Sequence, residues 1–367
     1  MGWVRKRPSG SWQARYRDAD RKMHSQTFKR EGDAKAWLRL IDASVVTGTY
    51  VNPDKAKTTV QGFFDEWSPR QIWATGTRTA MNTALKSCTF SDVPMGKLRR
   101  SHVEQWVKAM DAAGLQPTTI KTRVANVRSV LRAAVRDKVL AEDPSEGVPL
   151  PRQRRREHSM SIPTPETVQK ALDASPDHFR LFVALCAYAG LRVGEASALQ
   201  LGDVDFLRRQ VHVQRQVQRA AVAGVEMTPP KAGSERVVFL PDALVEMIAW
   251  HVEHVGVRGS EQWLFVGARE MPLPSDGVGG YWRRMLDAAG IARFKMHDLR
   301  HFYASGLIAA GCDVVTVQRA LGHAKASFTL NVYSHLWPTA EDRTRAAAAD
   351  LMRGSSGPPV AQTVETG

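Results

Sequence analysis

The stretch MHDLRH at residues 296–301 carries the most informative pattern in this chain. His297, Arg300 and His301 are three and four residues apart, so on a helix they share one face. Two histidines four apart can bind one zinc ion, but the metalloprotease pattern has Glu where this chain has Asp298, and an arginine would repel the cation. Partly buried histidines beside an ion-paired arginine are the plain structural alternative.

Further polar residues in the same half of the chain extend this pattern. They are Arg192 in GLRVGE (190–195), Lys231 in KAGS (231–234), His323 in LGH (321–323) and Tyr333 in NVYSH (331–335). Attack on a phosphodiester needs guanidinium groups that stabilise charge on the non-bridging oxygens. It also needs an acid for the departing 5′-oxygen and a nucleophile that can hold the phosphate covalently. These residues supply every group on that list without a metal or another cofactor.

The region from about residue 160 predicts helices around a small sheet. The apolar run Leu181–Leu191 is typical of a core helix and is about half as long as a membrane span. Strands are expected at 211–213 and 237–240, with a turn at 231–234 between them. Helices are expected again towards the end, and a disordered tail is expected over 354–367.

The excess of positive charge lies in the first 157 residues. The 367 residues include 51 Lys and Arg against 37 Asp and Glu, a formal charge of +14. Residues 1–57 contain 13 basic and 6 acidic side chains, residues 58–157 contain 17 and 10, and residues 158–367 contain 21 of each. A polyanionic partner is therefore expected, nucleic acid before a membrane surface, and the front modules should supply most of the affinity.

Several classes of protein do not fit the sequence. Cys88, Cys186 and Cys312 are too far apart for a zinc motif or a disulfide framework, which favours a reducing compartment. The first residues lack a signal-peptide core, so a cytoplasmic location without membrane attachment is expected. The phosphate loop of many ATPases and the glycine-rich dinucleotide motif are both missing from the sequence.

Residues 1–57 predict a small sheet followed by a helix. Trp12–Arg17 alternates apolar and basic side chains, a second strand is expected through Ser25–Lys29, and a helix is expected from about Gly32 to Thr47. The helix should present Ala36, Trp37, Leu40 and Ile41 on one face. The basic residues expected to contact phosphates are Arg5, Lys6, Arg15 and Arg17. A solvated basic face on a packing domain is the alternative.

Residues 58–150 predict an all-helical domain. Its clearest helix has Ile120, Val124, Val127, Leu131 and Val135 on the core face. Arg128, Arg132 and Arg136 follow another face, where they are either solvated or in contact with a nucleic-acid backbone. The basic run at 151–159, with Arg154, Arg155 and Arg156, is typical of a linker that lies along phosphates.

The ordered motifs GLRVGE, PPKAGSERVV, HDLRH and LGHAKASFTLNVYSH resemble those of tyrosine recombinases of the phage-integrase type, over nearly the whole chain. This resemblance implies a multidomain α+β fold. The implied parts are an arm-type DNA-binding domain at 1–57, a helical core-site-binding domain at 58–150, a linker at 151–159 and a mainly α catalytic domain with a small antiparallel sheet at 160–353. The interval from His323 to Tyr333 is one residue longer than in many members, but both lengths occur, so Tyr333 remains the expected nucleophile and Tyr303 and Tyr281 are the nearest rivals in sequence.

The resemblance also implies a role for each motif residue. Arg192 and Arg300 would bind the scissile phosphate, and His323 would donate a hydrogen bond to it. Tyr333 would be the nucleophile, with His297 as its partner in proton transfer. Lys231 would be the acid that protonates the 5′-hydroxyl leaving group. Glu195 is expected to orient the basic groups, and His301 to be a supporting, structural residue. No cofactor or metal is expected.

The implied function is site-specific recombination that integrates or excises DNA at attachment sites. The expected partners are double-stranded DNA of arm and core type, three further copies of the chain in a synaptic tetramer, a host DNA-bending protein and an excisionase. Thr344–Met352 predicts a helix that docks on a neighbouring subunit or caps its own domain. A type IB-like topoisomerase, which relaxes DNA without joining sites, and a non-catalytic DNA-binding regulator are the alternatives.

Overall fold

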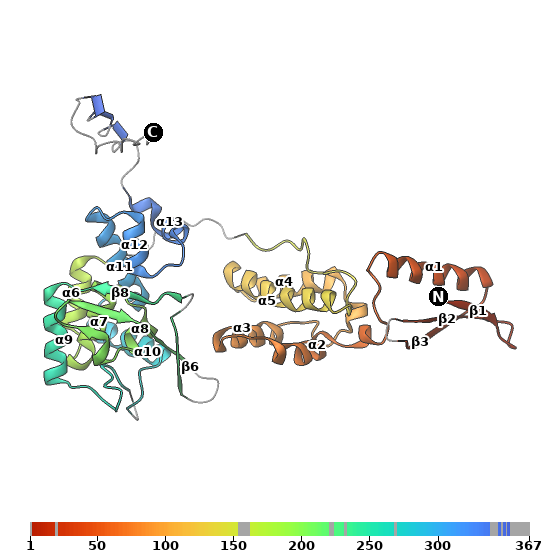
Figure 1. The fold of residues 1–367 in the computed structure, drawn as a ribbon, viewed down its shortest axis with the longest axis horizontal. Helices are drawn as coiled ribbons and strands as arrows, with labels where there is room; N and C mark the ends of the chain where they lie inside the picture. Colours follow the sequence, from red (N-terminus) through yellow and green to blue (C-terminus); the bar gives the residue numbers. More distant parts are fainter. Residues whose placement is uncertain are drawn as a thin grey trace, which may run out of the picture. The chain divides into compact units, whose positions relative to one another are not determined.

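The computed structural model describes residues 2–18, 21–152, 162–219, 224–230, 233–267, 270–337, 344–345, 348–349 and 351–352. The chain divides into two compact units, Met1–Glu157 and His158–Gly367 (Figure 1). Both combine helices with small antiparallel sheets, which confirms the predicted α+β class. Lys231, the linker arginines Arg154, Arg155 and Arg156, residues 346, 347 and 350 of the predicted helix at 344–352, and the tail at 354–367 lie outside the described residues.

The first unit begins with a three-stranded antiparallel sheet and a helix. The elements are β1 (Trp3–Lys6), β2 (Trp12–Arg17), β3 (Met23–Phe28) and α1 (Glu31–Val46), in sheet order β1-β2-β3. Ala14 and Tyr16 of β2 are buried under α1 with Ala34 and Leu38. The prediction for Leu40 was wrong, because its side chain is 69% exposed. A small sheet covers only a narrow stripe of the helix, and the stripe centres on Ala34 and Leu38.

The rest of the first unit is helical, as the sequence predicts. Its elements are η1 (Lys55–Lys57), α2 (Val60–Trp67), η2 (Ser68–Arg70), α3 (Thr75–Lys86), η3 (Met95–Lys97), α4 (Arg100–Ala112) and α5 (Pro117–Arg136). Pro117 stands in the first turn of α5, where its missing N–H costs no hydrogen bond. Four of the five predicted core residues of α5 are fully buried and Val135 is partly buried, which confirms the predicted face.

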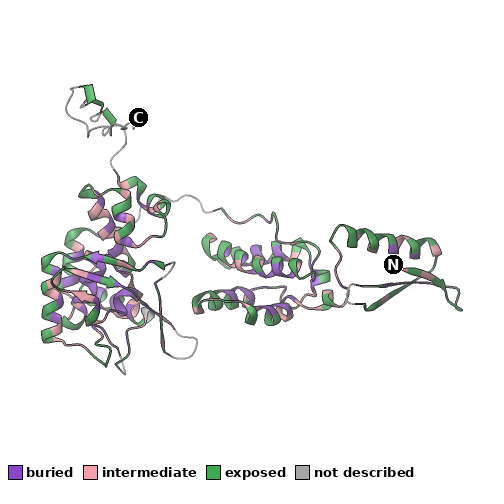
Figure 2. Cartoon of the chain, in the orientation of Figure 1, coloured by how far each residue is buried: buried purple, intermediate pink, exposed green. Residues whose placement is uncertain are grey.

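The second unit is built around one buried helix. Its helices are α6 (Pro165–Asp173), α7 (Asp177–Tyr188), α8 (Val193–Ser197), η4 (Leu201–Asp203), α9 (Asp242–His254), α10 (Ser275–Ala288), α11 (Met296–Ala309), α12 (Val314–Leu321), α13 (Ala326–Tyr333) and η7 (Ser334–Leu336). The predicted core helix is α7, whose residues Leu181–Ala187 are buried (Figure 2). It packs against α9 and α11, so α11 is placed directly on the core.

The described part of the second unit also contains the strands β4 (Val204–Asp205), β5 (Gln210–Val213), β6 (Gln216–Arg219), β7 (Val225–Thr228) and β8 (Arg236–Phe239). The two predicted strands pair antiparallel as β5 and β8, with Val211 opposite Val238. The β6–β7 hairpin between them was not predicted, because each of its strands is only four residues long. Gln216 Nε2 donates to the carbonyl of Pro229 at 2.9 Å, which holds the chain two residues before Lys231.

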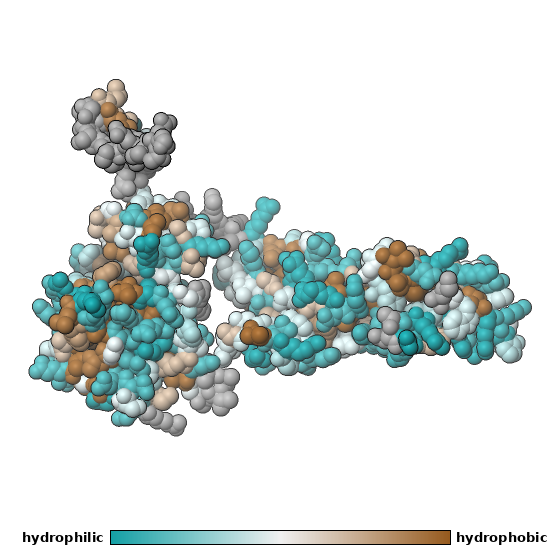
Figure 3. Space-filling model, in the orientation of Figure 1, coloured by the Kyte–Doolittle hydropathy of each residue, from teal (hydrophilic) through white to brown (hydrophobic). Residues whose placement is uncertain are grey.

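The surfaces of both units are largely hydrophilic, with scattered apolar spots on the face that Figure 3 shows. Within the described ranges, every helix is too short or too polar to cross a membrane. The same residues contain no group of three or more His, Cys, Asp or Glu side chains placed to hold a metal ion.

Candidate active site

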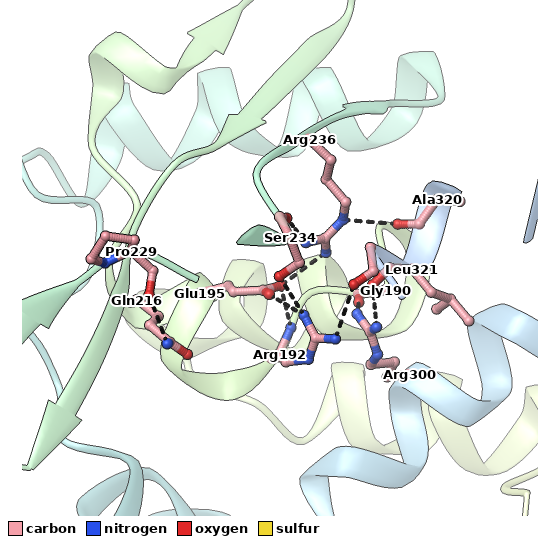
Figure 4. Close-up of polar contacts among 11 residues, drawn as sticks. Gly190, Arg192, Glu195, Gln216, Pro229, Ser234, Arg236, Arg300, Ala320 and Leu321 are labelled. Carbon is pink, nitrogen blue, oxygen red and sulfur yellow. Dashed lines mark hydrogen bonds and ion pairs between the residues drawn. The ribbon is translucent and has the colours of Figure 1, made fainter. Parts of the chain in front are cut away.

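The second unit gathers residues from five of its segments into one polar cluster. Arg192 precedes α8, Arg300 and His301 lie on α11, His323 follows α12, Tyr333 ends α13, and Arg236 begins β8. His297, Arg300 and His301 share a face of α11, as their spacing predicts. Figure 4 shows the arginine side of this cluster around Glu195.

Arg300 is held by two backbone carbonyls. Its side chain is buried, Nη1 donates to the carbonyl of Gly190 at 2.5 Å, and Nη2 donates to the carbonyl of Leu321. Burial, with Arg192 and Arg236 nearby, lowers the pKa of Arg300 to about 9, so the guanidinium remains charged at neutral pH. Gly190 adopts a positive φ of 62°, and a Cβ there would lie 2.3 Å from the ring of Tyr303. Only glycine can present this carbonyl to Arg300.

Arg192 is oriented by a buried carboxylate. Its backbone N–H donates to Glu195 Oε2 at 3.0 Å and its Nη1 donates to Oε1 at 2.5 Å, while Nη2 is 3.4 Å from the carbonyl of Gly322. Burial alone would raise the pKa of Glu195, but the hydrogen bond from Arg236 and the charges of Arg236 and Arg192 lower it to about 2. Glu195 is therefore ionised, and it accepts hydrogen bonds from both Arg192 and Arg236.

Arg236 is a residue of this cluster that the sequence analysis missed. Its side chain is 6% exposed, and Nη2 donates to Glu195 Oε2 at 2.8 Å while Nε donates to the carbonyl of Ala320 at 2.9 Å. Arg236 thus ties β8 and Glu195 to the end of α12, just before His323. A charged residue in a short strand is usually solvated, so the sequence carries no signal for this contact.

Tyr333 is buried and hydrogen-bonded to a histidine. It is 1% exposed, packs with Ala304, Ile308 and Val317, and its hydroxyl is 2.7 Å from His301 Nδ1. Burial raises the pKa of Tyr333 to about 12, although Arg300 and Arg192 oppose the shift. The imidazole that reaches the phenolic oxygen is that of His301, one turn along α11 from His297.

His323 and His297 face the arginine charges. Burial and then the charges of Arg300 and Arg192 lower the pKa of His323 to about 4. Desolvation, His301 and Arg300 also lower the pKa of His297, whose ring centroid lies 4.8 Å from that of His301. Both imidazoles are therefore neutral at pH 7. His323 Nδ1 is 2.9 Å from the hydroxyl of Thr329.

The other expected DNA contacts belong to the first unit. Arg5 and Lys6 are exposed on β1, and Arg15 and Arg17 alternate with the buried Ala14 and Tyr16 on β2. On α5, Arg128 and Arg132 have partners inside the unit. Arg128 donates to Ser145 through Nε at 3.0 Å and Nη2 at 2.7 Å, Arg132 Nε is 3.3 Å from Asp143, and Arg136 is exposed.

This arrangement suits attack on an anionic ester. Two fixed guanidinium groups can bind the non-bridging oxygens of one phosphate and stabilise the charge that develops there. A phenol with a hydrogen-bonded imidazole is a nucleophile next to a group that can accept its proton.

Two family models and several integrases match this chain. The model of the phage integrase family matches residues 163–339, and the model of the phage integrase N-terminal domain matches residues 1–46. A prophage phiRv2 integrase of Mycobacterium tuberculosis is 26% identical over 365 residues, covering 96% of this chain and 95% of the relative. The integrase of Mycobacterium phage L5 is 25% identical over 342 residues, covering 88% and 91%.

Solved structures share the fold. A Tn1549 transposon integrase in complex with a circular intermediate DNA has a TM-score of 0.68 at 19% identity, covering 80% of this chain and 99% of that one. A lambda integrase dimer bound to a COC′ core site has a TM-score of 0.58 at 16% identity, covering 97% of both chains. A lambda integrase tetramer bound to a Holliday junction has a TM-score of 0.59 at 18% identity, covering 88% and 96%.

Proposed function

This chain belongs to the phage integrase family of tyrosine recombinases, and we propose that it breaks and rejoins DNA at attachment sites through a 3′-phosphotyrosine on Tyr333. The observation that carries the proposal is the convergence of Arg192 and Arg300 on one buried network beside Tyr333. Both arginines hydrogen-bond carbonyls of the Leu321-Gly322 segment, so their guanidinium groups are fixed before a phosphate arrives.

The proposed cleavage step conserves the energy of the DNA backbone. The Tyr333 oxygen bonds to the scissile phosphorus, and the bond from phosphorus to the 5′-oxygen breaks. The phenolic proton passes to a neighbouring imidazole: the family resemblance implies His297, and in the structure His301 Nδ1 lies 2.7 Å from the phenolic oxygen. Lys231 protonates the departing 5′-oxygen. His323 donates a hydrogen bond to a non-bridging oxygen. A 5′-hydroxyl of another strand can then reverse the step, so no ATP or other cofactor is required.

We extend the proposal to the parts of the chain and their partners. Residues 1–57 would bind arm-type DNA, residues 58–150 core-type DNA, and residues 160–353 carry out the chemistry. The solved lambda integrase tetramer on a Holliday junction supports a synaptic tetramer of this chain. A host DNA-bending protein is a further proposed partner, because a chain that binds two kinds of site at once needs the DNA between them to bend. An excisionase is proposed from the family resemblance.

A covalent-trapping assay combined with a recombination assay tests this function. On duplex core-site DNA nicked beside the cleavage position, the chain is expected to form a denaturation-resistant protein–DNA adduct. On two plasmids that carry matching sites, it is expected to join them. Relaxation of supercoils without joining would indicate the topoisomerase alternative, and DNA binding without any adduct would indicate a non-catalytic regulator.

The charge distribution predicts where DNA affinity resides. Because the excess of 14 positive charges lies entirely in residues 1–157, the isolated fragment 158–367 should bind duplex DNA much more weakly than the whole chain at moderate salt. Each phosphate contact contributes a slope of about −0.9 to the dependence of log K on log salt, so the fragment should also show the shallower slope. Fluorescence anisotropy over a sodium chloride series measures both quantities. Equal affinity and equal slope would contradict this division.

A further inference from the structure

The side chain of Thr329 points to the active site rather than to its own helix. Thr329 lies on α13 and is fully buried, and its hydroxyl is 2.9 Å from His323 Nδ1. Threonines inside other helices of this chain behave differently, since the hydroxyls of Thr79, Thr83 and Thr122 each donate to the carbonyl four residues earlier. That local bond is the usual choice of a helical threonine. Thr329 instead hydrogen-bonds a residue of the site.

The backbone of His323 is already fixed, which leaves the imidazole ring to be positioned. The N–H of His323 donates to the carbonyl of Gln318 at 3.0 Å, and the carbonyl of His323 accepts from Gln318 Nε2 at 2.8 Å. Phe328 packs against the ring with centroids 4.8 Å apart and an interplanar angle of 73°. Thr329 supplies the polar contact to Nδ1, and among the described residues none hydrogen-bonds Nε2, which leaves that edge to meet a ligand.

A neutral imidazole carries one proton, and its position decides what the ring can bind. The positive neighbours Arg300, Arg192 and Arg236 oppose a second proton on His323. If Nδ1 carries the proton, Nε2 presents a lone pair and would repel an anionic phosphate oxygen. If Nε2 carries the proton, the ring donates to that oxygen. A non-bridging phosphate oxygen is only an acceptor, so the second tautomer is the useful one.

We propose that Thr329 is a positioning residue whose hydroxyl donates to Nδ1 of His323 and thereby keeps the imidazole proton on Nε2, facing the scissile phosphate. This inference rests on the proposed function of His323 as a hydrogen-bond donor to that phosphate. Thr329 does not touch the DNA itself. It acts by fixing the tautomer and the ring orientation, as partners of functional histidines do at other sites.

The matched variants are Thr329→Val, which keeps the shape and removes the hydroxyl, and Thr329→Ser, which keeps the hydroxyl. Nitrogen-15 NMR of the full chain labelled at histidine reports which ring nitrogen carries the proton, and His323→Ala identifies the His323 signals. We expect the Nε2–H tautomer in the wild type and in Thr329→Ser, and a loss of that preference in Thr329→Val. An Nδ1–H tautomer in the wild type would overturn the inference.

Single-turnover cleavage of nicked core-site DNA at saturating concentration supplies the second readout. Thr329→Val should cleave about tenfold more slowly, the effect of one lost hydrogen bond, with the DNA dissociation constant unchanged. Thr329→Ser should stay within about threefold of the wild type. In a His323→Ala background, Thr329→Val should have no further effect, because the two residues act as one unit. Thr83→Val, a threonine-to-valine change on α3, is the control for general effects on the fold.

The outcomes separate this inference from the proposed function. If the wild type cleaves DNA and the Thr329→Val variant cleaves it equally fast, the role of Thr329 is overturned and the proposed function stands. A wild-type chain that never forms an adduct would overturn the proposed function, and the NMR measurement would still decide the tautomer. A slow Thr329→Val variant whose defect persists in full in the His323→Ala background would also overturn the inference, because the effect would not pass through His323.

Discussion

A Tyr333→Phe variant should bind core-site DNA as the wild type does and should never become covalently attached to it. The substitution removes only the phenolic oxygen, which is the atom proposed to attack the phosphate. The ring remains, so the packing against Ala304, Ile308 and Val317 is kept. The lost hydrogen bond to the half-buried His301 should cost about 1 kcal/mol of folding stability, too little to unfold the domain.

Denaturing electrophoresis of the reaction on nicked core-site DNA measures the adduct, and a gel-shift titration measures binding. Tyr303→Phe is the matched control, because Tyr303 lies on α11 against Gly190 and the change leaves its ring in place. This control should form the adduct. A covalent complex with the Tyr333→Phe variant would place the nucleophile elsewhere.

An Arg192→Ala variant should cleave about 10²–10³ times more slowly than the wild type, the loss seen when one preorganised donor to a developing oxyanion is removed. Arg192 reaches the site from the start of α8, held by Glu195. Its guanidinium would offer two N–H groups to the phosphate, which an ammonium cannot reproduce. Arg192→Lys should therefore recover only part of the rate, although it restores the charge.

Removing Arg192 also changes a buried ion network, so folding must be measured beside the rate. Glu195 keeps its bond from Arg236 in the variant, and circular dichroism with thermal melting should show a folded domain. Arg208→Ala is the control, because Arg208 is an exposed arginine of the same unit whose contacts are with Asp205. Cleavage by Arg192→Ala at a rate near that of the wild type would remove Arg192 from the phosphate clamp.

The elements that the sequence predicts best are those with one strong pattern. The run Leu181–Leu191 marks α7 because continuous apolar residues need burial on all sides, and the core face of α5 follows from residues at helical spacing. The shared face of His297, Arg300 and His301 follows from the helix alone. Each of these predictions depends on local periodicity, which the sequence contains.

What the sequence could not predict depends on contacts between distant segments. Arg236 becomes part of the site only because β8 passes between Glu195 and the end of α12. The pairing of His301 with Tyr333 joins residues 32 positions apart, and two histidines one turn apart on α11 look equivalent until α13 is placed. The exposure of Leu40 likewise depends on how narrow the sheet beneath α1 is.

Mass spectrometry of the trapped adduct tests the central claim most directly. Tyr333 is the one tyrosine in the tryptic peptide 326–343, whereas Tyr303 falls in 301–319 and Tyr281 in 270–283. After nuclease and trypsin digestion of the wild-type complex, we expect the residual nucleotide on peptide 326–343, bound to Tyr333 through its 3′-phosphate. A nucleotide on either of the other peptides, or a link through a 5′-phosphate, would contradict the proposed mechanism.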